Sequence, residues 1–274
     1  MSTAKNGEVE IHYEEFGAET DPTLVLVNGL GSQCINFPEE WCWKFAAGGY
    51  KVVRFDNRDT GLSSKLDGVD YTTSDMAGDV LAVLDAVEAE RAHVMGLSMG
   101  GMIVQRLAID HADRLLSMTS VMSSTGEPGY GRSSAAAFAV LTAAPAKSRQ
   151  EYIDNHEAAI GIYGSKPEWI DPAYVRARAA AAYDRCFCPA GLRRQARAVM
   201  ADRSRVEALR RVTVPTLVLH GSRDVLIDPS GGRRTAELIP SARYVEIDGL
   251  GHDYPPAAWD QWVAAWADFV SRLP

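Results

Sequence analysis

The sequence predicts an α/β protein with a mostly parallel sheet and helices on both faces. Three observations favour this class. Short apolar runs alternate with helical patterns over most of the 274 residues, which is typical of parallel sheets covered on both sides. Polar or Gly-rich loops follow several of these runs, where open α/β sheets place their sites. One G-x-S-x-G pentapeptide, Gly96–Gly100, stands between such a run and such a helix.

The elements can be assigned in order from their apolar periodicity. Short apolar or alternating runs indicate strands at residues 9–16, 23–27, 51–55, 92–95, 115–122, 216–220 and 242–247. Apolar stripes of helical period indicate helices at about residues 39–47, 73–89, 99–109 and 256–273. The second helix has Thr72 or Thr73 as its cap. The residues before the first strand, 1–8, are mostly polar, and no element is assigned there.

The stretch from about residue 124 to 211 interrupts this alternation. It contains no convincing strand, and its Ala-rich helical segments are separated by prolines. Asp171 before Pro172 is a favourable helix start, with Asp as the cap and Pro at the first helical position. We therefore expect a core of residues 1–123 and 212–274 with a helical insertion, 124–211. A helical bundle unrelated to the functional site is the alternative.

The pentapeptide places Ser98 on a tight turn between a strand and a helix. The apolar run before it ends at Met95, and the helical pattern begins at Met99. In this context G-x-S-x-G forms a nucleophile elbow, which strains the serine backbone and lifts the hydroxyl clear of the sheet. Ser98 is therefore the candidate nucleophile. On the motif alone, an ordinary glycine turn is the alternative.

A candidate acid and a candidate base follow two later strands. Asp224 lies in the loop after one apolar run, and His252 lies in the glycine-rich loop after the next. Both would meet Ser98, because the carboxyl ends of parallel strands lie at one edge of a sheet. Asp228 is the alternative acid, but the spacing from Gly221 favours Asp224.

Four motifs in a fixed order span residues 24–253. They are Asn28–Gly31, Asp56–Ser63, the elbow, and the paired loops of Asp224 and His252. With these motifs the chain resembles the α/β-hydrolase superfamily, in the branch of small bacterial esterases, cofactor-free haloperoxidase-like enzymes and polyketide methylesterases. The resemblance implies the α/β-hydrolase fold, an inserted helical cap over the nucleophile, and a triad in the order Ser98, Asp224, His252.

The resemblance also implies an oxyanion hole and substrate contacts. The backbone N–H groups of Leu30 and Met99 would hold the oxyanion. Gly29, Phe37 and Met122 are the candidate substrate contacts, and core packing is the alternative for Phe37, which follows the oxyanion loop. The family usually has His-Gly where this chain has Asn28-Gly29. The side-chain hydrogen bonding of this loop is therefore expected to differ.

These groups predict a serine hydrolase that cleaves a small-molecule carboxylic ester through an acyl-enzyme, without cofactor or metal. His252 would take the proton of Ser98, and Asp224 would fix the tautomer of His252. We expect short to medium acyl chains, because an Ala-rich insertion would cover a limited cavity. A lactonase, such as one for acyl-homoserine lactones, a perhydrolase or a polyketide methylesterase would share this chemistry. A small-molecule receptor with little turnover is the alternative from another class.

Composition excludes several partners. The net charge of −8 without a basic cluster argues against nucleic acid and anionic membranes. The N-terminal residues lack an apolar signal segment, and no apolar run approaches the length of a membrane span. A cytoplasmic location is therefore expected, with the four cysteines reduced and buried. Asp56 and Arg58 are expected to pair with each other, and His93 and His220 to be structural.

Overall fold

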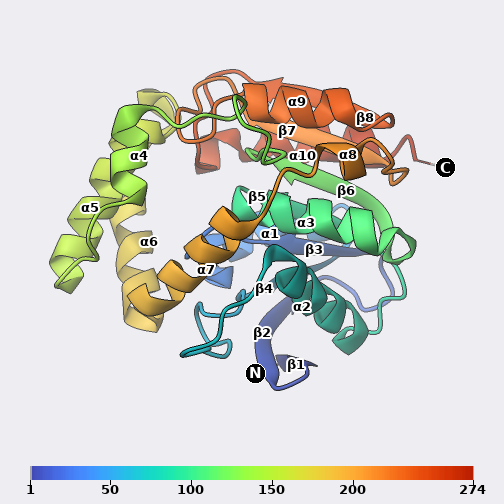
Figure 1. The fold of residues 1–274 in the computed structure, drawn as a ribbon, viewed down its shortest axis with the longest axis horizontal. Helices are drawn as coiled ribbons and strands as arrows, with labels where there is room; N and C mark the ends of the chain where they lie inside the picture. The colour runs from blue at the N-terminus through green and yellow to red at the C-terminus, as the bar shows by residue number, and fades with distance from the viewer. Residues whose placement is uncertain (1, 274) are drawn as a thin grey trace.

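The protein, described by a computed structural model over residues 2–273, contains one sheet between two layers of helices (Figure 1). Its eight strands lie in the order β1-β2-β4-β3-β5-β6-β7-β8. The β1–β2 and β2–β4 pairs are antiparallel, and all later pairs are parallel. The strands are β1 (Ser2–Asn6), β2 (Val9–Phe16), β3 (Thr23–Val27), β4 (Lys51–Phe55), β5 (Ala92–Leu97), β6 (Leu115–Val121), β7 (Thr216–Gly221) and β8 (Ala242–Ile247).

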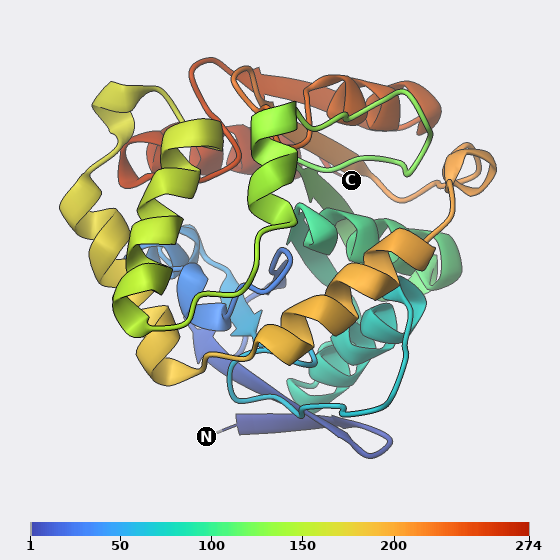
Figure 2. The ribbon, with the colours of Figure 1, turned by 60° about the vertical axis from the view of Figure 1, so that its left-hand side comes forward.

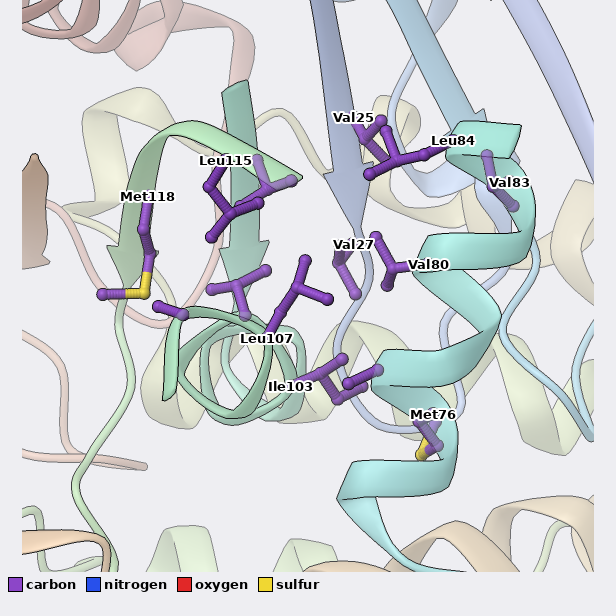
Figure 3. Close-up of a cluster of buried hydrophobic side chains, with 14 of the residues drawn as sticks. Val25, Val27, Met76, Val80, Val83, Leu84, Ile103, Leu107, Leu115 and Met118 are labelled. Atoms are coloured by element: carbon purple, nitrogen blue, oxygen red, sulfur yellow. The ribbon is translucent and has the colours of Figure 1, made fainter. Parts of the chain in front are cut away.

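Two apolar layers hold the helices to the sheet. Helices α2 (Thr73–Ala86) and α3 (Met99–Asp110) pack on one face, together with α8 (Val206–Leu209) and α9 (Ser230–Leu238). Helices α1 (Glu39–Ala46) and α10 (Trp259–Val270) cover the other face. Alternate residues of β3 serve the two layers, because successive strand side chains point to opposite faces. Figure 3 shows Val25 and Val27 of β3 facing Val80 and Leu84 of α2.

The strand order reverses beside β3. From β3 the chain moves to β4 on one side and then to β5 on the other. Such a switch point leaves a crevice at the carboxyl ends of the two strands, where α/β sheets bind ligands. The loop after β3 and the turn at Ser98 after β5 flank this crevice. The topology therefore predicts a ligand site between these two segments.

Between β6 and β7 the chain leaves the sheet. Four helices precede the short helix α8 there: α4 (Ala135–Leu141), α5 (Arg149–Tyr163), α6 (Pro172–Arg185) and α7 (Pro189–Ala201). Helices α4, α5 and α6 lie side by side outside the two layers that cover the sheet, and α7 runs from them toward α3 and α8, where Ala198 joins the apolar layer of α2 and α3 (Figure 2). The predicted start of α6 is confirmed, because the Asp171 side chain accepts the N–H of Ala173 and Pro172 opens the helix.

The structure confirms the predicted strands and corrects the two ends of the chain. Residues Ser2–Asn6 form β1, which pairs antiparallel with β2 and buries Ala4. This edge strand was missed because its other side chains are polar and mostly face solvent. The predicted last helix is split into a 3-10 turn, Pro256–Ala258, and α10. Within residues 2–273, no helix combines the length and apolar character required to cross a membrane.

Candidate functional site

Ser98 occupies a strained turn at the carboxyl end of β5. Its φ of 57° and ψ of −116° lie where L residues are rarely found. Its N–H donates to Val121 O at 2.9 Å, and its carbonyl accepts the hydroxyl of Ser123 at 2.8 Å. These bonds to β6 and the segment after it hold the backbone in place. Strain of this kind is common at functional sites.

The flanking glycines allow this turn to form. A Cβ on Gly96 would lie 2.1 Å from Gly100 O, and a Cβ on Gly100 would lie 2.1 Å from Val27 O. Both atoms belong to backbone, which cannot move aside without shifting a strand or α3. Helix α3 therefore begins directly after Ser98 and points its free N–H groups toward the serine.

The loop after β3 contacts the elbow. A Cβ on Gly29 would lie 3.3 Å from the Cβ of Ser98 and 3.8 Å from its Oγ. Among residues 2–273, the N–H groups of Leu30 and Met99 have no protein acceptor. Two unpaired amide donors thus lie on the segments that flank Ser98. The Asn28 side chain, where a His was expected from the resemblance, donates to Gln33 O at 3.0 Å within the same loop.

The structure brings Asp224 and His252 together. Nδ1 of His252 lies 2.7 Å from Oδ2 of Asp224, and the Asp224 side chain has no exposed surface. An ionised carboxylate can only accept, so Nδ1 carries a proton, and in the neutral imidazole Nε2 keeps a free lone pair. The N–H of His252 also donates to Tyr163 O at the end of α5, at 2.7 Å. The insertion therefore helps to place this histidine.

Asp224 is held as a carboxylate by its surroundings. Burial alone would raise its pKa, but the charge of His252 and the hydrogen bonds of His220 and His252 outweigh burial and hold the pKa well below its usual range. Oδ1 accepts the N–H groups of Leu226 and Ile227, each at 2.9 Å. Both oxygens are therefore engaged, and the carboxylate has a fixed orientation.

His220 lies closer to this site than the sequence suggested. Its fully buried ring places Nε2 at 2.8 Å from Ile227 O and 3.2 Å from Oδ2 of Asp224. Since Ile227 O only accepts, Nε2 carries the proton and donates it to this carbonyl, with the Asp224 carboxylate close beside it. A Cβ on Gly232 of α9 would lie 2.4 Å from Nδ1 of His220, so the helix is shaped around the ring. In the sequence, the position of His220 four residues before Asp224 was the observation that could have predicted this contact.

The neighbouring acids serve other contacts. Asp228 accepts the N–H of Ser230 at 2.8 Å and of Arg132 at 3.1 Å, at the start of α9. Asp253 accepts the N–H and hydroxyl of Ser165, in the segment after α5. Burial raises the pKa of Asp253. The carboxylate that bonds to His252 therefore comes from Asp224.

The residues predicted to contact substrate have different environments. Gly29 lies against Ser98, as described above. Phe37 has no exposed surface and stacks on Trp41 in the layer under α1, with ring centroids 5.4 Å apart. Met122 is 2% exposed and has a φ of 41° at the end of β6. The ring of Tyr163 stands edge-to-face to His252, with centroids 6.1 Å apart.

Two further expectations are wrong. Asp56 and Arg58 do not pair with each other: Asp56 bonds to Arg185 of α6 at 2.8 Å, and Arg58 bonds to Asp79 of α2 at 2.6 Å. Each side chain is buried against a different helix and pairs with a residue of opposite charge on that helix. All four cysteines are free, but two of them, Cys186 and Cys188, are only half-buried. His93 is structural as expected, with Nδ1 at 2.8 Å from Ser117 Oγ.

One group of side chains has the composition of a metal site. The ligand atoms of His12, Cys34 and Asp56 lie within 4.8 Å of one another. The guanidinium of Arg185 already bonds to Asp56 and lies 3.3 Å from the Cys34 sulfur. Burial, followed by the charge of Asp56, raises the pKa of the Cys34 thiol. A metal ion would need a deprotonated thiol and a free carboxylate, but the thiol is protonated and Asp56 is paired with Arg185. These side chains therefore form a buried ion pair rather than a cation site.

Comparison with known proteins agrees with this geometry. The α/β-hydrolase fold family matches residues 22–254, and the chain belongs to this family. Rhodomycin D methylesterase DnrP from Streptomyces peucetius is 30% identical over 95% of this chain and 94% of its own. The protein is thus a hydrolase of the α/β fold.

Solved structures show the same fold. The esterase RhEst1 from Rhodococcus sp. ECU1013 superposes with a TM-score of 0.81 at 24% identity, over 99% of this chain and 98% of its own. The enol-lactonase from Burkholderia xenovorans LB400 gives a TM-score of 0.80 at 24% identity, over 99% of this chain and 100% of its own. Identities at this level establish architecture alone.

We predict that His220→Leu lowers the free energy of unfolding by about 2 kcal/mol, because Ile227 O and Asp224 lose a buried donor. His220→Gln keeps an N–H donor and is expected to lose about half as much. Urea unfolding at neutral pH measures both variants. A leucine variant as stable as the parent protein would contradict the assigned hydrogen bonds.

Proposed function

We propose that this hydrolase cleaves carboxylic esters by an acyl-enzyme mechanism with Ser98 as nucleophile. The observation that carries the proposal is the buried Asp224–His252 hydrogen bond of 2.7 Å. It lies at the carboxyl edge of the sheet, where Ser98 occupies its left-handed turn after β5. A serine alcohol is a weak nucleophile unless a base removes its proton. The free Nε2 of His252 supplies such a base.

The reaction follows from these groups. Ser98 Oγ attacks the ester carbonyl carbon while its proton passes to Nε2 of His252. The resulting imidazolium is stabilised by the Asp224 carboxylate. The C–O bond to the alcohol then breaks, and the alcohol leaves with the proton from His252. Water, deprotonated by the same Nε2, attacks the acyl-enzyme, releases the acid and restores Ser98.

Backbone N–H donors stabilise the negative charge that develops on the carbonyl oxygen. The N–H groups of Leu30 and Met99 are unpaired among the described residues and flank Ser98. Met99 is also the first residue of α3, whose dipole favours negative charge at that end. One such donor typically contributes about 3 kcal/mol of transition-state stabilisation.

The substrate proposed is a small-molecule ester with a short to medium acyl chain. The insertion presents Tyr163 beside His252, so the acyl group would lie against apolar and aromatic side chains. Three apolar residues of the insertion, Phe138, Leu141 and Ile162, are about half exposed and are therefore not enclosed in a buried cavity. A methyl ester of a larger acid is the second candidate, because DnrP, 30% identical, is a methylesterase.

We predict that a fluorophosphonate probe labels Ser98 and no other residue. Ser98→Ala is expected to abolish both labelling and steady-state release of p-nitrophenol from its acetate ester. Ser222→Ala, a serine beside the same sheet edge, serves as the matched control and should retain both. Undiminished labelling of the Ser98→Ala protein would refute the mechanism. Labelling with no turnover beyond one equivalent would favour a receptor.

The role of Asp224 is tested by replacing it with an amide. Asp224→Asn is expected to lower kcat about 10⁴-fold with the fold retained, because the amide favours the wrong imidazole tautomer. Asp228→Asn should keep kcat within about threefold. Circular dichroism and steady-state kinetics check both variants. The reverse ranking would transfer the role to Asp228.

Acyl specificity is predicted to peak at short to medium chains. Each buried methylene contributes about 0.8 kcal/mol, roughly a fourfold gain in kcat/KM while the chain still fits. A series of p-nitrophenyl esters from C2 to C16 measures this dependence, with methyl esters of aromatic acids and acyl-homoserine lactones assayed in parallel. A maximum at C16 would exclude a limited pocket. A tenfold preference for methyl esters or lactones would select that alternative.

A further inference from the structure

The loop after β3, Asn28–Gln33, is held by two different parts of the chain. At its start the core holds it, since Asn57 Nδ2 donates to Asn28 O at 3.1 Å. At its end the insertion holds it, since Gln33 Nε2 donates to Ala182 O at 2.6 Å and to Cys186 O at 2.9 Å. Leu30 lies between these two anchors. The position of its N–H therefore depends on how the insertion docks.

We propose that Gln195, on α7, is a positioning residue that sets the oxyanion loop, defined as Asn28–Gln33. The inference rests on the proposed function, in which the N–H of Leu30 stabilises the oxyanion. Oε1 of Gln195 accepts the N–H of Gly31 at 2.8 Å, and its Nε2 donates to Arg58 O at 2.7 Å. The side chain has no exposed surface.

The orientation of the Gln195 amide is fixed by its partners. Arg58 O can only accept, so the NH₂ group faces it and the carbonyl oxygen faces the N–H of Gly31. One side chain thus joins the loop after β3 to the loop after β4. The bond restrains the Leu30–Gly31 peptide, which directly follows the Gly29–Leu30 peptide that carries the proposed donor.

Shape reinforces the hydrogen bonds. Gly31 has a φ of 69°, and a Cβ there would lie 2.7 Å from Cδ1 of Leu192, near the start of α7. A Cβ on Gly191 would lie 2.1 Å from Asp59 O, in the loop after β4. The beginning of α7 is therefore pressed against both loops. Glycine on each side of the contact allows Gln195 to reach Gly31.

This arrangement predicts an effect on rate rather than on substrate affinity. A donor stabilises the transition state only if it is already fixed where the oxyanion forms. Without Gln195, the turn at Gly31 would still be packed against Leu192, but its N–H would lack a buried acceptor. The loop would then have to be ordered during the reaction, which lowers kcat and leaves KM nearly unchanged.

The test compares two neighbouring residues of α7. Gln195→Met removes both hydrogen bonds at similar volume. Arg194→Met is the matched control, because the Arg194 side chain bonds to Asp59, at 2.7 Å, and to Asp67 rather than to the oxyanion loop. With active sites counted by fluorophosphonate titration, Gln195→Met is expected to lower kcat about tenfold with KM within twofold. It should weaken a boronic acid inhibitor about tenfold. Arg194→Met should lower Tm but keep kcat per site within threefold.

A conservative variant covers the case in which Gln195→Met does not fold. In Gln195→Glu, a protonated carboxyl keeps one acceptor and one donor, so kcat should recover toward the parent value. Deprotonation at higher pH removes the donor to Arg58 O, because a carboxylate only accepts. The ratio of variant to parent kcat is therefore expected to fall as pH rises. A constant ratio would contradict the role of Gln195.

The outcomes separate this inference from the proposed function. If the parent protein forms no adduct with the fluorophosphonate or the boronic acid, the proposed function fails and the role of Gln195 fails with it. If the parent forms both adducts and Gln195→Met matches it in kcat and inhibitor affinity, only the positioning role is overturned. Equal losses of kcat in both methionine variants would assign the effect to helix docking in general.

Discussion

The close approach of α3 to β3 and β5 is the constraint on which the rest of the site depends. With no Cβ on Gly96 or Gly100, backbone meets backbone at the turn, and Ser98 is forced into a left-handed conformation. Two hydrogen bonds to β6 and the residues after it offset that strain. The start of α3 and the loop after β3 are thereby brought to the same point. A side chain at either glycine would separate them.

The buried charges around this point are neutralised by elements distant in sequence. Asp56 bonds to Arg185 of α6, and Asp59 bonds to Arg194 of α7. A buried ion pair is weak evidence for stability, because desolvation offsets much of the attraction. Its larger effect is on the specificity of the fold, since a buried carboxylate without its arginine would raise the free energy of any other arrangement. The loop after β4 thus requires the insertion in one arrangement.

The insertion therefore does more than cover the sheet. Tyr163 O accepts the N–H of His252, and Gln195 accepts the N–H of Gly31. If Ser98 is the nucleophile, these helices hold the backbone of the base and of the residue next to one proposed oxyanion donor. Preorganised groups of this kind need no reorganisation as charge develops. The contacts of Tyr163 and Gln195 are then expected to couple the insertion to activity.

The sequence by itself determined the backbone pattern and the candidate triad, whereas tertiary structure decided which side chains meet. Strand and helix periodicity is local, and the elbow is written in five consecutive residues, so both could be predicted. The partners of Asp56 and Arg58 could not, because Arg185 lies 129 residues from Asp56. Gln195 carries no local signal, since its role depends on a contact 164 residues away at Gly31. Such pairs are fixed by packing, which one-dimensional periodicity does not encode.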